Sequence, residues 1–303
     1  MINRRTVLAS AGMLAAAGTV VRAQSWKAQY PELVFAVIPA ENASGVLDRW
    51  QPFMDYLSRE LGTKVTLRVA NDYAAVIEGQ RSGTVHIGSY GPASFSRALI
   101  TGVPITAFAI DVNEDGTKGY HSVFYVKKDS PYQKIEDLKG KNLGLVDPNS
   151  TSGYNVPLFS LDKMGIDAEK YFGHVVVTGS HENAIIALQN GQVDVCANWW
   201  NDANESNLRR MERKGMAKYD DFRIIFTSPL IVNSPMAYLN SLPEDLKKAI
   251  SAAVLNVATK DKAAFDRITD GKAKPWQTVT NDDYKPIIEL VQFVDRLKRR
   301  SAS

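Results

Sequence analysis

The chain has 303 residues, enough for about two domains, and its 45% hydrophobic and 23% charged residues are ordinary for a soluble globular protein. Its formal net charge is only +3 and no Lys- or Arg-rich patch occurs, so we expect no nucleic-acid binding. The one cysteine, Cys196, excludes an internal disulfide.

The first 23 residues have the pattern of a secretory signal peptide. Arg4 and Arg5 precede an Ala-rich apolar run that ends in a small-residue cleavage pattern, Val21-Arg22-Ala23. The run is too short for a membrane-spanning helix, and the paired arginines suit either the twin-arginine or the Sec export route. Three of the 36 basic residues and none of the 33 acidic ones lie here, so the exported chain is expected to be neutral. Without a cysteine to carry a lipid in this segment, we expect a free periplasmic protein rather than a lipoprotein.

The next part of the chain predicts alternating strands and helices. Apolar runs without polar alternation indicate buried strands, and apolar residues at helical spacing followed by glycine indicate helices. The expected order is strand 32–38, helix 47–61, strand 65–69, helix 73–78, strand 85–88 and helix 93–100. This β-α-β order predicts a mostly parallel sheet covered by helices.

The same pattern recurs later in the chain. The expected elements are strand 142–146, helix 158–164, strand 174–177, helix 182–190 and strand 193–197. The helix-glycine-strand segments 73–87 and 183–195 are similar, which indicates two similar α/β lobes.

A β-rich run at 120–126 and a return stretch at 224–234 connect the lobes, and two such crossings predict a hinge with a cleft. Three further helices, at 243–259, 262–268 and 284–298, are predicted to pack on the first lobe. The predicted domains are a signal peptide at 1–23, a first lobe at 24–122 and 235–303, and a second lobe at 123–234.

A polar strand-to-helix turn at 147–157 is the candidate ligand site. It contains Ser150, Thr151, Ser152 and Gly153, after a buried strand and before a helix. The first N–H groups of a helix have no partner inside it and the helix dipole is positive there, so an oxyanion fits this place. From these residues alone, the alternative is that the hydroxyls only cap the helix. Other polar and aromatic residues also follow strands, where ligands of open α/β sheets bind: Tyr90, His181 and Asn198-Trp199-Trp200.

Several motifs in one order resemble the periplasmic phosphonate-binding proteins of ABC importers, the PhnD-like family. They are Asp-Pro-Asn-Ser-Thr-Ser-Gly-Tyr-x-Val-Pro at 147–157, Gly-Tyr-His-Ser-Val at 119–123, Asn-Asp-Tyr-Ala at 71–74 and Gly-Ser-His-Glu at 179–182. The resemblance covers nearly the whole exported chain. It implies the type II periplasmic binding fold, with two lobes of mixed, mostly parallel sheet and two hinge crossings. It also implies capture of a phosphonate or related phosphorus oxyanion, such as phosphite, for delivery to ABC permease subunits. We expect a monomer without cofactor or metal.

The resemblance assigns roles to several side chains. Ser150, Thr151 and Ser152 would hold the oxyanion through hydroxyl and backbone N–H groups. His181 would add a ring N–H, and Tyr73 and Tyr120 would add phenol hydroxyls from the first lobe. Without the resemblance, each of these three residues is as readily a packing or surface residue. Hydrogen bonds to an anion contribute about 1.5–3 kcal/mol each, so several fixed donors suffice without a cation.

The chain departs from members that take aminoalkyl phosphonates, which carry two carboxylates for the ligand's ammonium. The first such position corresponds to Asn198-Trp-Trp-Asn-Asp202, and the second to Val232-Asn-Ser234. Asp202, beside Asn201, is the one remaining candidate acid. Trp199 and Trp200 either wall the pocket, face an organic group or only pack. We therefore expect an aminated phosphonate to bind more weakly than a non-aminated one.

Two other function classes remain open from the sequence. An enzyme on the same fold is the weaker one, since the chain contains no His-Glu-x-x-His, Gly-x-Ser-x-Gly, Gly-x-Gly-x-x-Gly or P-loop motif. The other is a sensor subunit that presents its ligand state to a membrane kinase. The sequence does not separate sensing from transport.

Overall fold

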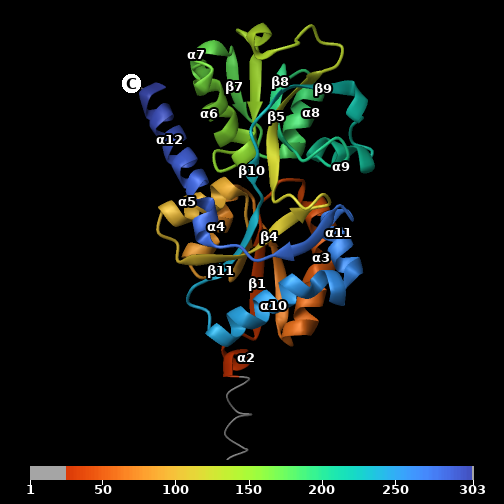
Figure 1. Cartoon of the computed structure of the whole chain (residues 1–303), viewed down its shortest axis with the longest axis vertical. Coiled ribbons are helices and arrows are strands. Elements are labelled where there is room, and N and C mark those ends of the chain that lie inside the picture. Colours follow the sequence, from red (N-terminus) through yellow and green to blue (C-terminus); the bar gives the residue numbers. More distant parts are fainter. Residues whose placement is uncertain (1–24, 302–303) are drawn as a thin grey trace, which may run out of the picture.

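The computed structural model describes residues 25–301, which form two lobes joined in the middle of the molecule (Figure 1). The signal peptide predicted at 1–23 lies outside the described residues. Between residues 25 and 301, no helix has both the length and the apolar character needed to cross a membrane.

The first lobe is built on a six-stranded mixed sheet in the order β12-β4-β11-β3-β1-β2. The strands β1, β2 and β3 are parallel, whereas β11 and β12 run antiparallel to their neighbours. The strands are β1 (Glu32–Val37), β2 (Lys64–Val69), β3 (Ile87–Ser89), β4 (Ile105–Asn113), β11 (Pro235–Leu239) and β12 (Ala273–Gln277). The helices are α2 (Ser25–Gln29), α3 (Ala43–Leu61), α4 (Tyr73–Arg81), α5 (Pro92–Ile100), α10 (Glu244–Lys260) and α11 (Lys262–Thr269).

The long helix α3 shows why this lobe folds as the sequence predicts. Its apolar face buries Phe53 and Leu57, and Phe53 packs edge-on against Trp276 with ring centroids 5.3 Å apart. Asn42 caps its N-terminus by accepting a hydrogen bond from the Gly45 N–H at 2.8 Å. The helix ends at Gly62, whose φ of 62° is a backbone conformation that favours glycine.

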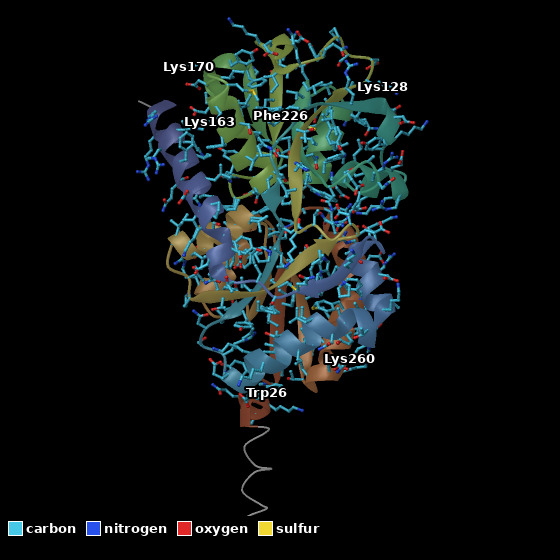
Figure 2. All side chains as sticks on the ribbon, viewed as in Figure 1. Trp26, Lys128, Lys163, Lys170, Phe226 and Lys260 are labelled. Carbon is cyan, nitrogen blue, oxygen red and sulfur yellow. The ribbon has the colours of Figure 1, made fainter. Side chains whose placement is uncertain are left out.

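The second lobe contains a sheet in the order β10-β5-β8-β6-β7, with β9 also paired to β5. The strands β7, β6 and β8 are parallel, and β5 is antiparallel to β8, β9 and β10. The strands are β5 (Gly119–Lys127), β6 (Asn142–Leu145), β7 (His174–Val177), β8 (Val195–Trp200), β9 (Phe222–Thr227) and β10 (Ile231–Val232). The helices are α6 (Val156–Lys163), α7 (Ala168–Tyr171), α8 (His181–Gln189) and α9 (Asn207–Arg213). Inside this lobe Phe226 packs on Phe124 with ring centroids 5.3 Å apart, whereas the labelled lysines lie at the surface (Figure 2).

The chain crosses between the lobes after β4 and again between β10 and β11. The predicted boundary at 122/123 falls inside β5, because Gly119 and Tyr120 already pair with Val232 and Ile231 of β10. All of β5, with Tyr120, therefore belongs to the second lobe, and not to the first as the sequence suggested. The two-lobe α/β architecture itself agrees with the prediction.

The last helix, α12 (Lys285–Ser301), differs from the prediction because it packs on both lobes (Figure 1). On α5 of the first lobe, Arg97 Nη2 donates to Asp295 Oδ1 at 2.8 Å. On α6 of the second lobe, Phe159 packs edge-on against Phe293 with ring centroids 5.2 Å apart. The helix is thus a third link between the lobes.

Candidate functional site

A cavity of about 210 Å³ lies between the two lobes and is lined by residues from both. Tyr73, Tyr90 and Asp111 line it from the first lobe, and Ser150–Ser152, His181 and Trp199 line it from the second. At roughly 30 Å³ for each water molecule, its volume corresponds to roughly seven water-sized positions. It therefore suits a ligand of few non-hydrogen atoms.

The turn after β6 forms one end of the cavity as a π-helical turn, Thr151–Asn155, that leads into α6. Ser150 caps this turn, since its Oγ accepts from the Gly153 N–H at 3.1 Å. Asn155 Nδ2 holds the turn from behind by donating to the carbonyls of Pro148 at 2.9 Å and Ser150 at 2.8 Å. A Cβ on Gly153 would lie 2.4 Å from the Val146 side chain, so the close approach requires glycine. The hydroxyls of this turn are thereby held at the cavity.

Thr151 joins the two lobes directly. Its Oγ1 accepts a hydrogen bond of 2.8 Å from the Ala93 N–H in the first turn of α5. Tyr120 lies beside the Thr151 and Ser152 side chains, and burial raises the pKa of its phenol to about 12. The Tyr120 hydroxyl is therefore protonated at neutral pH and acts as a hydrogen-bond donor.

Two further groups point at this end of the cavity without a partner of their own. The Tyr73 hydroxyl, at the start of α4, lies near Ser150 but meets no hydrogen-bond geometry among the described residues. His181 begins α8; its Nε2 lies 3.4 Å from Ser150 Oγ, and its Nδ1 is buried without a partner within the described chain. Burial lowers the pKa of His181 to about 3, so the ring is neutral. A buried polar group left without a hydrogen bond costs about 1–3 kcal/mol. A ligand that forms the missing hydrogen bonds to both side chains is therefore favoured.

The structure thus brings six of the predicted residues together. We call this set the oxyanion cradle; its members are Tyr73, Tyr120, Ser150, Thr151, Ser152 and His181.

The other three predicted residues are used differently. Tyr90 lines the cavity, but its hydroxyl donates to Gln80 Oε1 at 2.6 Å. Asn201 also lines it, and its Nδ2 donates to Asn113 Oδ1 at 3.2 Å across the lobes. Asp202 does not reach the cavity: it is exposed, and its Oδ1 accepts from the backbone of its own loop, including the Glu205 N–H at 3.0 Å.

The two tryptophans separate into different roles. Trp199 lines the cavity, and the Arg210 guanidinium lies over its ring at 4.8 Å from the centroid. Trp200 instead packs near His121, with ring centroids 5.8 Å apart.

Sequence reasoning missed a charged region at the other side of the cavity. Arg49 on α3, Asp111 on β4 and Arg210 on α9 all line it, but they lie far apart in the sequence and belong to no recognisable motif. Arg49 Nε lies 3.0 Å from Glu41, and Arg210 Nε lies 2.9 Å from Glu205. No periodicity could have placed these residues together.

At the cavity and next to it, charged side chains of the two lobes meet across the cleft. We call this group the cross-cleft ion cluster. Arg210 and Arg213 contact Asp270 at 2.7 and 3.1 Å, and Lys214 contacts Glu41 at 2.5 Å. In the same cluster, buried Glu182 of the second lobe accepts from the Asn42 backbone N–H and from its Nδ2, each at 2.8 Å. The lobes are therefore closed on each other.

Comparison with known proteins identifies relatives that match most of the chain. A family model described as "ABC transporter, phosphonate, periplasmic substrate-binding protein" matches residues 35–284. The phosphonates-binding periplasmic protein of Escherichia coli K12 is 33% identical over 272 residues, covering 88% of this chain and 77% of that protein. The phosphate-import protein PhnD of Mycolicibacterium smegmatis is 30% identical, covering 84% of each chain.

Solved structures give the same result. The binding-protein component of a Pseudomonas aeruginosa ABC phosphonate transporter has a TM-score of 0.79 at 29% identity, covering 88% of each chain. PhnD1 of Prochlorococcus marinus in complex with methylphosphonate has a TM-score of 0.76 and covers 88% of this chain and 98% of that one, and at 22% identity it shows the fold alone. The type II two-lobe fold predicted from the sequence is confirmed.

Proposed function

The chain belongs to the family of periplasmic phosphonate-binding proteins of ABC transporters, and we propose that it captures a small phosphorus oxyanion in its cleft for delivery to permease subunits. The resemblance found in the sequence is thereby confirmed. The observation that carries the proposal is the oxyanion cradle, in which two buried polar atoms, the Tyr73 hydroxyl oxygen and His181 Nδ1, have no hydrogen-bond partner among the described residues. Members of this family are transport proteins, which favours binding over turnover.

The cradle recognises an anion by hydrogen bonds alone. Tyr73 and Tyr120 stay protonated because burial raises the pKa of each phenol. His181 is neutral and offers one ring N–H. Charge-assisted hydrogen bonds contribute about 1.5–3 kcal/mol each, so a few of them offset the lost hydration of a phosphonate or phosphite. An anion held without a cation is also released when the lobes separate, as delivery requires.

Ligand capture requires both lobes. Tyr73 belongs to the first lobe, whereas Tyr120, the 150–152 turn and His181 belong to the second. An oxyanion bound by the second lobe therefore gains a hydrogen bond from Tyr73 only when the lobes close. The hydrogen bond from the Ala93 N–H to Thr151 Oγ1 forms in the same movement. The differential contact is what favours the closed state. We further propose that the protein acts in the periplasm as a monomer, exported by the predicted signal peptide.

The test is calorimetry on residues 24–303 with phosphite, methylphosphonate, phosphate and sulfate. We expect a phosphorus oxyanion to bind with micromolar or tighter affinity and sulfate to bind more weakly. No heat with any phosphorus oxyanion would refute the proposal. Release of phosphate from a bound phosphonate on prolonged incubation would instead support an enzyme.

A further inference from the structure

The two crossings between the lobes lie next to each other and are joined by a backbone hydrogen bond and by one side-chain amide. The first crossing leads from Asn113, at the end of β4, to Gly119, at the start of β5, and the second passes through Asn233 between β10 and β11. The Asn233 backbone N–H donates to the Lys118 carbonyl at 3.0 Å. Asn113 Nδ2 donates to the Gly119 carbonyl at 2.6 Å, and Asn113 Oδ1 accepts from Asn233 Nδ2 at 3.3 Å. The Asn113 side chain thus contacts the far end of its own crossing and the middle of the other.

The Asn113 amide uses all of its hydrogen-bonding capacity. Its Nδ2 also donates to Thr117 Oγ1 at 2.8 Å, and its Oδ1 also accepts from Asn201 Nδ2 at 3.2 Å. A primary amide has two donor hydrogens and an oxygen with two lone pairs, so all four positions are occupied. The Gly119 carbonyl can only accept, which fixes the end of the amide that faces it. A carboxylate of the same shape would lack both donors.

The bond between Asn113 and Asn201 differs from the other three because it joins the two lobes away from the chain crossings. Asn201 is fixed to the second lobe: it follows β8, and its backbone N–H donates to the Glu205 carbonyl of the same loop at 2.9 Å. A rotation of the lobes about the crossings moves Asn201 relative to Asn113, whereas the partners of Asn113 within the crossings stay beside it. The bond between Asn113 and Asn201 is therefore formed when the lobes close.

Asn201 lines the cavity, but its amide is directed at the hinge. An ionised oxyanion presents only acceptors, so Asn201 could serve it only through Nδ2, and one Nδ2 hydrogen is already bonded to Asn113. The other end of the amide, Oδ1, cannot donate to an anion. The contact that Asn201 makes in the closed protein is thus the contact with Asn113.

We infer that Asn113 is a positioning residue of the hinge, which fastens the two crossings to each other and, on closure, holds the cavity-lining Asn201 in place. The inference goes beyond the proposed function and rests on it only for methylphosphonate as the probe of closure. It replaces the expectation that Asn201 binds the ligand: Asn113 and Asn201 act through each other and stabilise the closed state that retains the ligand.

The experiment is a double-mutant cycle of Asn113→Ala and Asn201→Ala, measured by calorimetry and stopped-flow kinetics with methylphosphonate. Each single variant should weaken binding by about fivefold or more, mainly through faster dissociation, because a hydrogen bond of the closed state is lost. In the Asn113→Ala protein, Asn201→Ala should weaken binding by less than about twofold, since its partner is already absent. Asn256→Ala removes an exposed amide that bonds inside α10; it is the matched control and should leave binding unchanged.

Hydrogen exchange measures the hinge without any ligand. Exchange over residues 113–119 should become faster in Asn113→Ala, because the bonds to Gly119 and Thr117 are lost, and should stay at the wild-type rate in Asn201→Ala. Asn113→Asp keeps the acceptor for Asn201 and removes both donors. It should therefore also accelerate exchange over residues 113–119, but Asn201→Ala should still weaken binding about fivefold in its background.

The inference and the proposed function fail in different ways. If Asn201→Ala weakens binding as much in the Asn113→Ala protein as in wild type, Asn201 contacts the ligand directly; the inference is overturned and the proposed function stands. Unchanged exchange over residues 113–119 in both Asn113 variants would overturn the hinge role in the same way. If wild type binds neither methylphosphonate, phosphite nor phosphate, the proposed function fails, and hydrogen exchange alone decides whether Asn113 fastens the hinge.

Discussion

Arg210 of the second lobe contacts Asp270 of the first lobe at 2.7 Å, at the edge of the cavity that it also lines. One guanidinium therefore belongs both to the ligand cavity and to the cross-cleft ion cluster. Burial raises the pKa of Asp270, but Arg210, Arg49 and Arg213 outweigh burial and hold that pKa below its ordinary value. The Asp270 charge consequently stabilises the closed arrangement at neutral pH, and this contribution is lost only as pH falls through the lowered pKa.

Replacing Asp270 by Asn should weaken ligand binding without a contact to the ligand. Its backbone φ of 54° is one that Asn also tolerates, so the turn after α11 should be kept. The cross-cleft contacts to Arg210 and Arg213 are lost, and we expect methylphosphonate affinity to fall by roughly tenfold, about 1.4 kcal/mol. Because the ion pairs exist only when the lobes meet, the loss should appear mainly as faster dissociation in stopped-flow measurements.

The matched control is Asp48→Asn, which removes an exposed acid that pairs with Arg267 inside the first lobe. We expect that change to leave methylphosphonate affinity within experimental error. Equal effects of the two variants would show that the cross-cleft ion cluster has no special role in closure.

Thr151→Val keeps the size of the side chain and removes its hydroxyl. We expect methylphosphonate binding to weaken by at least about 1 kcal/mol, because a donor to the anion is lost. The Ala93 N–H also loses its acceptor, but only when the lobes are closed, so the fold should be little affected. Thr178→Val is the control, since that hydroxyl bonds to the Leu145 carbonyl outside the cavity. Unchanged titration curves for Thr151→Val would reduce Thr151 to a structural cap.

His181 should make the ligand-free protein less stable in mild acid. Its pKa falls from about 6.5 to about 3 on folding, so between these pH values the imidazole is protonated in the unfolded chain and neutral in the folded chain. Stability is therefore lost as pH decreases below 6.5, by at most about 2 kcal/mol at pH 5. In urea titrations, the free energy of unfolding of wild type should fall between pH 7 and pH 5 by more than that of His181→Gln. The difference in stability between the two proteins should therefore narrow over this range. A gap that stays constant would mean that His181 titrates normally.

Ligand should close the two lobes about the crossings after β4 and after β10. With methylphosphonate at saturation, small-angle scattering should give a smaller radius of gyration than without it. Asp270→Asn without ligand should be at least as open as wild type. Identical curves with and without ligand would contradict capture by closure.

The parts of the site predicted from the sequence are those carried by contiguous residues. The 150–152 turn could be predicted because a buried strand precedes it, a helix begins after it and Gly153 lies next to it. In the structure only glycine fits at position 153, against the Val146 side chain. Asp111 and Arg210 were missed because α9 and β4 come together only when the lobes close. Asp202 was misplaced because its carboxylate turns back to cap its own loop, a local choice that the motif does not show.

The boundaries and the last helix were harder to predict for another reason. Whether β5 begins at Gly119 is decided by its pairing with Val232, more than a hundred residues away. An amphipathic α12 must bury its apolar face, but its sequence does not say against which lobe.

The position of α12 makes the opening of the molecule one-sided. It is fastened to α5 through Asp295 and to α6 through Phe293, on the side opposite α9 and α11 (Figure 1). A rotation that keeps both attachments separates the lobes at the cross-cleft ion cluster and leaves the α12 side as the axis. Ligand would then enter and leave through one opening of the cleft, at the edge where Arg213 contacts Asp270. Opening at that edge has to break the ion pairs that Arg210 and Arg213 make with Asp270.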